Sequence, residues 1–83
     1  MKRDVLYFAW VRERIGVGRE TVESDAHTAA DLIAELTQRS DQHAAAFADI
    51  TALRVAYDQE LTTLDATLGD TREVAFFPPM TGG

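Results

Sequence analysis

The chain has 83 residues, of which 46% are hydrophobic and 27% charged, and its formal net charge is −6. This length suits a single small domain, and the composition is too apolar for a disordered chain. The acidic balance argues against nucleic acid or an anionic membrane as a partner, because both attract clustered lysine and arginine. The sequence has no cysteine, which excludes disulfides, thiolate metal sites and a cysteine nucleophile and fits a cytoplasmic protein.

Two strands are expected in the first third of the chain. Residues 4–10 form a dense apolar and aromatic run that predicts a first strand. Gly16 and Gly18 mark a turn, and residues 19–24 predict a second strand that is exposed on one face. We expect the two strands to pair as a hairpin with a longer, irregular connection.

The clearest helix is predicted within residues 25–40. Thr28 suits the N-cap position, and Asp31 three residues later resembles a weak capping box. One apolar face follows at helical spacing, formed by Ala29, Leu32, Ile33 and Leu36. A second, shorter helix is expected within residues 41–50.

The last third of the chain predicts further strands. Leu53, Val55 and Tyr57 alternate at period two, residues 58–60 predict a turn, and Leu61 begins a short return strand. Residues 73–77 predict the last strand, which Pro78 ends because a proline cannot donate to a strand ladder.

This order of elements predicts an α+β fold, in which a sheet of four to five strands carries one main helix on one face. One helix cannot cover both faces, yet the first and last strands are apolar on both sides. We therefore expect part of an apolar set to remain exposed as a partner-binding patch, unless loops or the short helix cover it. That set is Leu6, Phe8, Trp10, Leu61 and Phe77.

Side chains with catalytic or metal-binding potential are sparse. His27 and His43 lack metal-ligand spacing, so we expect surface or cap residues and no metal site. The C-terminal run "AFFPPMTGG" is more informative. Pro78 and Pro79 make a stiff spacer, and the terminal glycines lack a Cβ, so a narrow channel of another protein can close around them. This suits a carboxylate that a partner activates as an acyl-adenylate, from which a sulfur nucleophile displaces AMP to leave a thiocarboxylate.

The whole chain resembles the family of small, sulfur-carrying subunits of molybdopterin synthase. The resemblance rests on "VLYFAWVRERIG", "LRVAYDQEL" and, most specifically, "GDTREVAFFPPMTGG". It implies a ubiquitin-like β-grasp fold. It also implies a chain that is not catalytic alone and binds no cofactor, and whose C-terminus is adenylated by an ATP-dependent, ubiquitin-activating-enzyme-like adenylyltransferase. A sulfur-donating protein then provides the sulfur, which passes to cyclic pyranopterin monophosphate in the large synthase subunit to build the molybdopterin dithiolene.

Carried over by position, the resemblance assigns Gly83 as the residue that is adenylated and thiocarboxylated, with Gly82 and Thr81 threading the channel of the partner. The predicted docking residues are Phe8, Leu61, Phe77 and, in the "VRER" stretch, Arg12. Two departures fall in turns: Asp58 stands where the family often has asparagine, and "GDTRE" is longer than the usual family turn.

We therefore expect a β-grasp domain over residues 1–77 and a flexible Gly-Gly tail over residues 78–83. Three alternatives stay open at this point. The chain could be a related carrier for the thiamine thiazole, a ubiquitin-like modifier of lysines, or an interaction domain whose terminal glycines are incidental.

Overall fold

The computed structural model describes residues 1–79. Its five strands form one mixed sheet in the order β2-β1-β5-β3-β4, in which β1 and β5 are parallel and the other neighbours antiparallel. The strands are β1 (Lys2–Tyr7), β2 (Arg19–Glu23), β3 (Arg54–Tyr57), β4 (Glu60–Thr62) and β5 (Glu73–Phe77). The helical segments are α1 (Ala9–Ile15), α2 (Ala29–Thr37), α3 (Asp41–Ala46) and the short 3₁₀ segment η1 (Ile50–Ala52). The predicted α+β fold with a sheet of four to five strands is confirmed.

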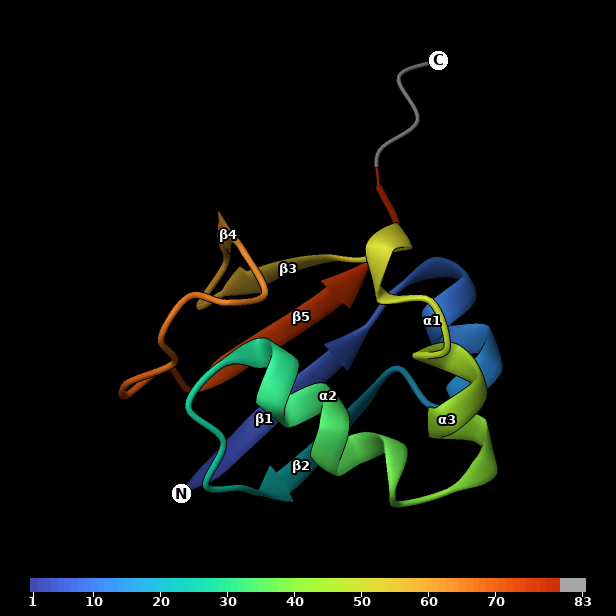
Figure 1. Cartoon of the computed structure of the whole chain (residues 1–83), viewed down its shortest axis with the longest axis horizontal. Coiled ribbons are helices and arrows are strands. Elements are labelled where there is room, and N and C mark those ends of the chain that lie inside the picture. Colours follow the sequence, from blue (N-terminus) through green and yellow to red (C-terminus); the bar gives the residue numbers. More distant parts are fainter. Residues whose placement is uncertain (80–83) are drawn as a thin grey trace.

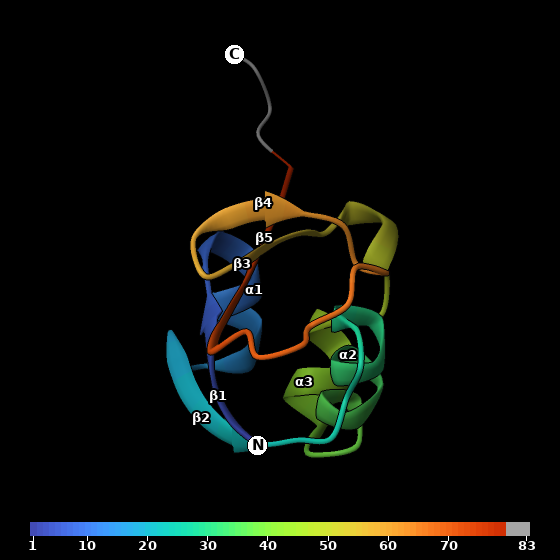
Figure 2. The same ribbon diagram turned by 90° about the vertical axis from the view of Figure 1, so that its left-hand side faces the viewer.

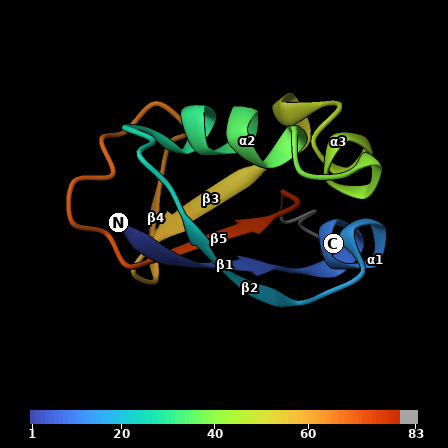
Figure 3. The same ribbon diagram turned by 90° about the horizontal axis from the view of Figure 1, so that it is seen from below.

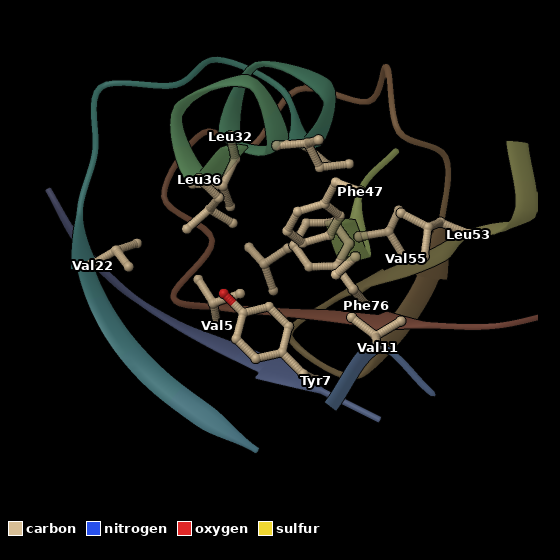
Figure 4. Close-up of a cluster of buried hydrophobic side chains, with 14 of the residues drawn as sticks. Val5, Tyr7, Val11, Val22, Leu32, Leu36, Phe47, Leu53, Val55 and Phe76 are labelled. Carbon is tan, nitrogen blue, oxygen red and sulfur yellow. The ribbon is translucent and has the colours of Figure 1, made fainter. Parts of the chain in front are cut away.

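The core lies between the sheet and the two helices α2 and α3, which cover the same face (Figures 2 and 3). Alternate residues of the two central strands point into it, and all of them are essentially inaccessible to solvent: Val5, Tyr7, Val74 and Phe76. They meet Leu32 and Leu36 of α2 and Phe47, which follows α3 (Figure 4). Burying side chains of this size stabilises the fold by about 1.5–3 kcal/mol each.

The expected first strand over residues 4–10 is too long. β1 ends at Tyr7, and the predicted irregular connection to β2 is the helix α1. Val11 and Ile15, four residues apart, share one face of this helix and are buried against the core. The aromatic run conceals this period, because three further apolar residues separate Tyr7 from Val11 and make the strand pattern look continuous.

Unusual backbone conformations mark both ends of α1. Phe8, the N-cap residue, is extended and makes no side-chain cap, and Ala9 has a left-handed φ of 52°. Gly16 closes the helix with φ 97° and donates its backbone N–H to the Arg12 carbonyl. A non-glycine residue at positive φ is uncommon, so the turn at Ala9 is a strained point of the backbone.

The prediction for α2 is confirmed. Its N-cap Thr28 accepts a hydrogen bond from the Asp31 backbone N–H at 3.1 Å, and the predicted apolar face is buried. α2 is the longest helix of residues 1–79, and α3 confirms the second, shorter helix expected within residues 41–50; α1 was not predicted. No helix among residues 1–79 is long and apolar enough to cross a membrane.

The connection from β3 to β4 is a tight turn at Asp58 and Gln59, which have φ values of 49° and 72°. Two successive positive φ values are typical of a type I′ hairpin. The Asp58 carboxylate also accepts backbone hydrogen bonds from Arg72 at 3.2 Å and Glu73 at 2.9 Å. Aspartate tolerates the left-handed region, so this departure from the family pattern preserves the hairpin and ties it to the start of β5.

A polar cluster joins β1, β2 and α3 at the edge of the core. Glu20 Oε2 accepts a hydrogen bond from the Tyr7 hydroxyl at 2.6 Å and lies 2.6 Å from His43 Nε2. Ser40 Oγ lies 2.7 Å from His43 Nδ1 and caps α3. His43 is only 8% exposed, so the expectation of a surface or cap residue was wrong for this histidine, whereas His27 is exposed as expected. Glu20, which is itself half-buried, supplies the polar partner that allows the imidazole to lie inside.

This cluster predicts a pH dependence of stability. Burial acts to raise the pKa of Glu20, but the hydrogen bonds from His43 and Tyr7 outweigh it and hold the pKa below its ordinary value of 4.5. A carboxyl group whose pKa is lower in the folded state than in the unfolded state stabilises the fold at pH values above its ordinary pKa. This stability is lost as the pH falls through the folded-state pKa. Burial, and after it the hydrogen bond to Glu20, raises the pKa of Tyr7.

We expect Glu20→Gln to lower the free energy of unfolding by about 1 kcal/mol at pH 7, after allowance for the partial exposure of the carboxylate. The difference from wild type should disappear in acid, below the folded-state pKa. Denaturant titrations at several pH values measure this, and Glu60→Gln, at an exposed hairpin position, serves as the control. If wild type and Glu20→Gln differed in free energy of unfolding by the same amount at pH 7 and in acid, the pH-dependent stability would not come from the Glu20 carboxylate.

Candidate docking face and C-terminal tail

The sheet face opposite α2 and α3 carries a row of apolar side chains that crosses four strands. The register pairs Leu6 of β1 with Ala75 of β5, Ala75 with Ala56 of β3, and Ala56 with Leu61 of β4. Residues paired in register share a face, so these four side chains lie side by side. The two alanines keep the middle of the row shallow.

Two phenylalanines extend this row towards the end of β5. Tyr7 and Phe76 point into the core, with 1% and 0% of their surface exposed, so the next residue of each chain segment points the other way. The backbone N–H of Phe8 donates to the Phe76 carbonyl at 3.2 Å, which holds Phe8 alongside the end of β5. We call the resulting surface the docking patch; it consists of Leu6, Phe8, Ala56, Leu61, Ala75 and Phe77.

Exposure supports the expectation of an apolar patch. Leu61 is 68% and Phe8 48% exposed, more than any other large hydrophobic residue of the described chain, and Phe77 is half-buried. Trp10 does not belong to this surface. It lies on α1, packs against the core and receives the Arg14 guanidinium 4.6 Å above its ring.

An apolar groove of about 580 Å³ adjoins the patch at Leu61. It lies along β4, and its apolar walls include Ile50, Leu53 and Leu64. Because β4 is an edge strand, this groove continues the apolar surface around the side of the sheet.

Arg12, the fourth predicted docking residue, is exposed on α1 outside the docking patch. Its Nε would lie 3.1 Å from a Cβ added at Gly18, so the side chain runs against the chain segment that leads into β2. The structure therefore brings Phe8, Leu61 and Phe77 onto one face and leaves Arg12 outside the docking patch.

The predicted reactive end follows directly from this face. β5 ends at Phe77, near α1 (Figure 1), and the half-buried Pro78 and Pro79 come next. Thr81, Gly82 and Gly83 lie outside the described residues, so their assigned roles stay predictions. Within residues 1–79 no group of three or more side chains is arranged to hold a metal ion.

Sequence reasoning missed two kinds of residue at this site. Ala56 and Ala75 complete the row between Leu6 and Leu61, but small residues give no strong pattern and only the strand register reveals them. Arg54 pairs in register with Phe77, the last residue of β5, and therefore places a positive charge beside the start of the tail.

Comparisons with known proteins agree with this geometry. The model of the ThiS family matches residues 5–83. The molybdopterin synthase sulfur carrier subunit of Escherichia coli K12 is 43% identical over 79 residues, which cover 95% of this chain and 96% of that protein.

Two solved structures share the fold over the full length of both chains. SAMP1 from Haloferax volcanii superposes with a TM-score of 0.76 at 23% identity. A chain from the complex of subunits 1 and 2 of the molybdopterin-converting factor of Helicobacter pylori has a TM-score of 0.64 at 21% identity. These likenesses confirm the ubiquitin-like β-grasp fold. The family match and the close curated relative show more: the chain belongs to the ThiS family and, within it, to the molybdopterin synthase sulfur carrier subunits.

Proposed function

We propose that this chain carries sulfur for molybdopterin synthesis as a thiocarboxylate at Gly83. The observation that carries the proposal is the position of the Gly-Gly end, six residues beyond a β5 that lies in the middle of the sheet. The family match, which extends through Gly83, and the name of the curated relative support it.

The chemistry requires an activated carboxyl group, because a carboxylate is a poor acyl donor. In the proposed sequence, a carboxylate oxygen of Gly83 attacks the α-phosphate of ATP on an adenylyltransferase and pyrophosphate leaves. Hydrosulfide supplied by a donor protein then attacks the acyl carbon, a carbon–sulfur bond forms, and the bond to AMP breaks. AMP takes the electron pair, and the thiocarboxylate remains. The carrier next delivers this sulfur to cyclic pyranopterin monophosphate in the large subunit. We place these steps in the cytoplasm, where ATP is available.

The fold contributes position rather than catalysis. β5 is hydrogen-bonded to β1 on one side and β3 on the other, so the start of the tail is anchored between two strands. Six extended residues span at most about 20 Å. A partner that binds the sheet beside Phe77 can therefore hold its active site within reach of Gly83.

The docking patch supplies the surface for such a partner. It combines two exposed or half-exposed aromatic rings, Phe8 and Phe77, with the protruding Leu61. Aromatic anchors on an apolar surface typically account for most of the binding energy of an interface. We infer that the large synthase subunit covers this patch and the adenylyltransferase uses an overlapping surface, with Arg12 at the margin. The Helicobacter pylori relative, which was solved as a complex of subunits 1 and 2, supports this choice of partner.

We expect Leu61→Asp and Phe77→Asp each to weaken binding to the large subunit by about 30-fold, the loss typical of a hot-spot residue. Titration calorimetry measures the affinity and thermal unfolding the stability. Val17→Asp is the matched control, because Val17 is 46% exposed but lies outside the patch. Equal weakening by Val17→Asp, or a large fall in melting temperature for Phe77→Asp, would contradict the assignment.

The reactive end is tested by intact mass. After incubation with the adenylyltransferase, ATP and a sulfur donor, the chain should show one oxygen-to-sulfur exchange, which peptide mapping should locate at Gly83. A variant with one residue added after Gly83 should melt at the wild-type temperature yet remain unmodified. An unmodified wild type, or equal modification of the extended variant, would contradict a carrier role for Gly83.

A further inference from the structure

The basic residues of this chain are almost entirely arginines. The sequence contains one lysine, Lys2, seven arginines and no cysteine. Side-chain amines and thiols are the groups that attack activated carboxyl groups, whereas the guanidinium of arginine stays protonated and does not. The chain therefore carries positive charge with few nucleophiles.

The amines that do occur lie far from the start of the tail. Lys2 is the first residue of β1, which runs parallel to β5. It therefore lies at the end of the sheet where β5 begins, opposite the end where the tail begins. Phe8 lies six positions after Lys2, which is about 20 Å along a strand. The α-amino group of Met1 lies at the same end, 3.0 Å from Glu23 Oε1 (Figure 1).

A cation nevertheless stands beside the start of the tail. Arg54 is exposed and pairs in register with Phe77, the last residue of β5. Directly opposed residues in an antiparallel pair have Cα atoms about 4.5–5.5 Å apart. The guanidinium Nη1 donates to the Leu53 carbonyl at 3.1 Å, so the side chain stays close to this end of the sheet. An amine at this position would lie within easy reach of a six-residue tail.

We propose that Arg54 is a specificity-determining residue of the activation reaction, because it places positive charge beside the tail without a nucleophilic amine. The inference rests on the proposed function, in which Gly83 becomes an activated acyl group. A lysine with a pKa near 10.4 is neutral in about one molecule in a thousand at pH 7.4, which is enough for slow acyl transfer.

The reaction that arginine avoids can be written explicitly. A neutral lysine nitrogen attacks the acyl carbon of Gly83, a carbon–nitrogen bond forms, and the bond to AMP or to a thiol breaks. The leaving group takes the electron pair, and the nitrogen loses one proton to water. The product is an amide, which no longer has an activated acyl group to accept sulfur, so each such event removes one carrier from the cycle.

The test uses a chain prepared as a thioester of 2-mercaptoethanesulfonate at Gly83 by intein cleavage. We compare wild type, Arg54→Lys, Arg54→Ala and Arg72→Lys; Arg72 is exposed and precedes β5 at its far end. Tethering gives the new amine at position 54 a millimolar effective concentration. We expect Arg54→Lys to lose its thioester to an intramolecular amide about tenfold faster than the other three. Intact mass identifies this product as one water lighter than the hydrolysed chain.

Two results would overturn the inference: no amide in Arg54→Lys, or equally fast amide formation in wild type or in Arg72→Lys. Thermal unfolding verifies that each variant is folded. Pyrophosphate release from ATP by wild type and the adenylyltransferase is measured separately. Absence of pyrophosphate release would contradict the proposed function. The thioester comparison does not use the adenylyltransferase, so it tests the effect of an amine at position 54 separately.

Discussion

The parallel pairing of β1 with β5 joins the two ends of the chain at the centre of the sheet. Through this pair Val5 and Tyr7 share the core with Val74 and Phe76, while Phe8 is held beside Phe77 on the opposite side. Neighbours on both sides also mean that the last strand cannot leave the sheet without breaking two ladders. The segment after Phe77 therefore starts from a fixed point.

Because side chains alternate along a strand, β1 and β5 contribute to two different surfaces. Residues of one parity bury against α2 and α3, and residues of the other form the docking patch. A soluble sheet normally makes its second face polar. Here apolar residues on that face leave exposed surface that the isolated chain does not bury, which is the pattern expected when another protein completes the structure.

The sequence predicts much of this arrangement, and the failures have identifiable causes. The period of α2 and the proline after Phe77 are strong local patterns, so that helix and the end of β5 were predicted correctly. α1 was missed because its first residues continue an aromatic run, and its helical period rests on Val11 and Ile15 alone. The burial of His43 depends on Glu20, 23 residues away, and the row through Ala56 and Ala75 depends on strand register. Such long-range pairings leave no local periodicity to read.

Sulfur transfer itself gives the most direct test of the central claim, that the end of this chain carries the sulfur. Thiocarboxylated chain is mixed with the large subunit and cyclic pyranopterin monophosphate, and the dithiolene product is counted against the thiocarboxylate consumed. Because a dithiolene holds two sulfur atoms and each carrier holds one, the account predicts that two carriers are consumed for each dithiolene formed and that each returns to a carboxylate at Gly83. Dithiolene formation with the thiocarboxylate intact, or consumption of thiocarboxylate without a dithiolene, would contradict it.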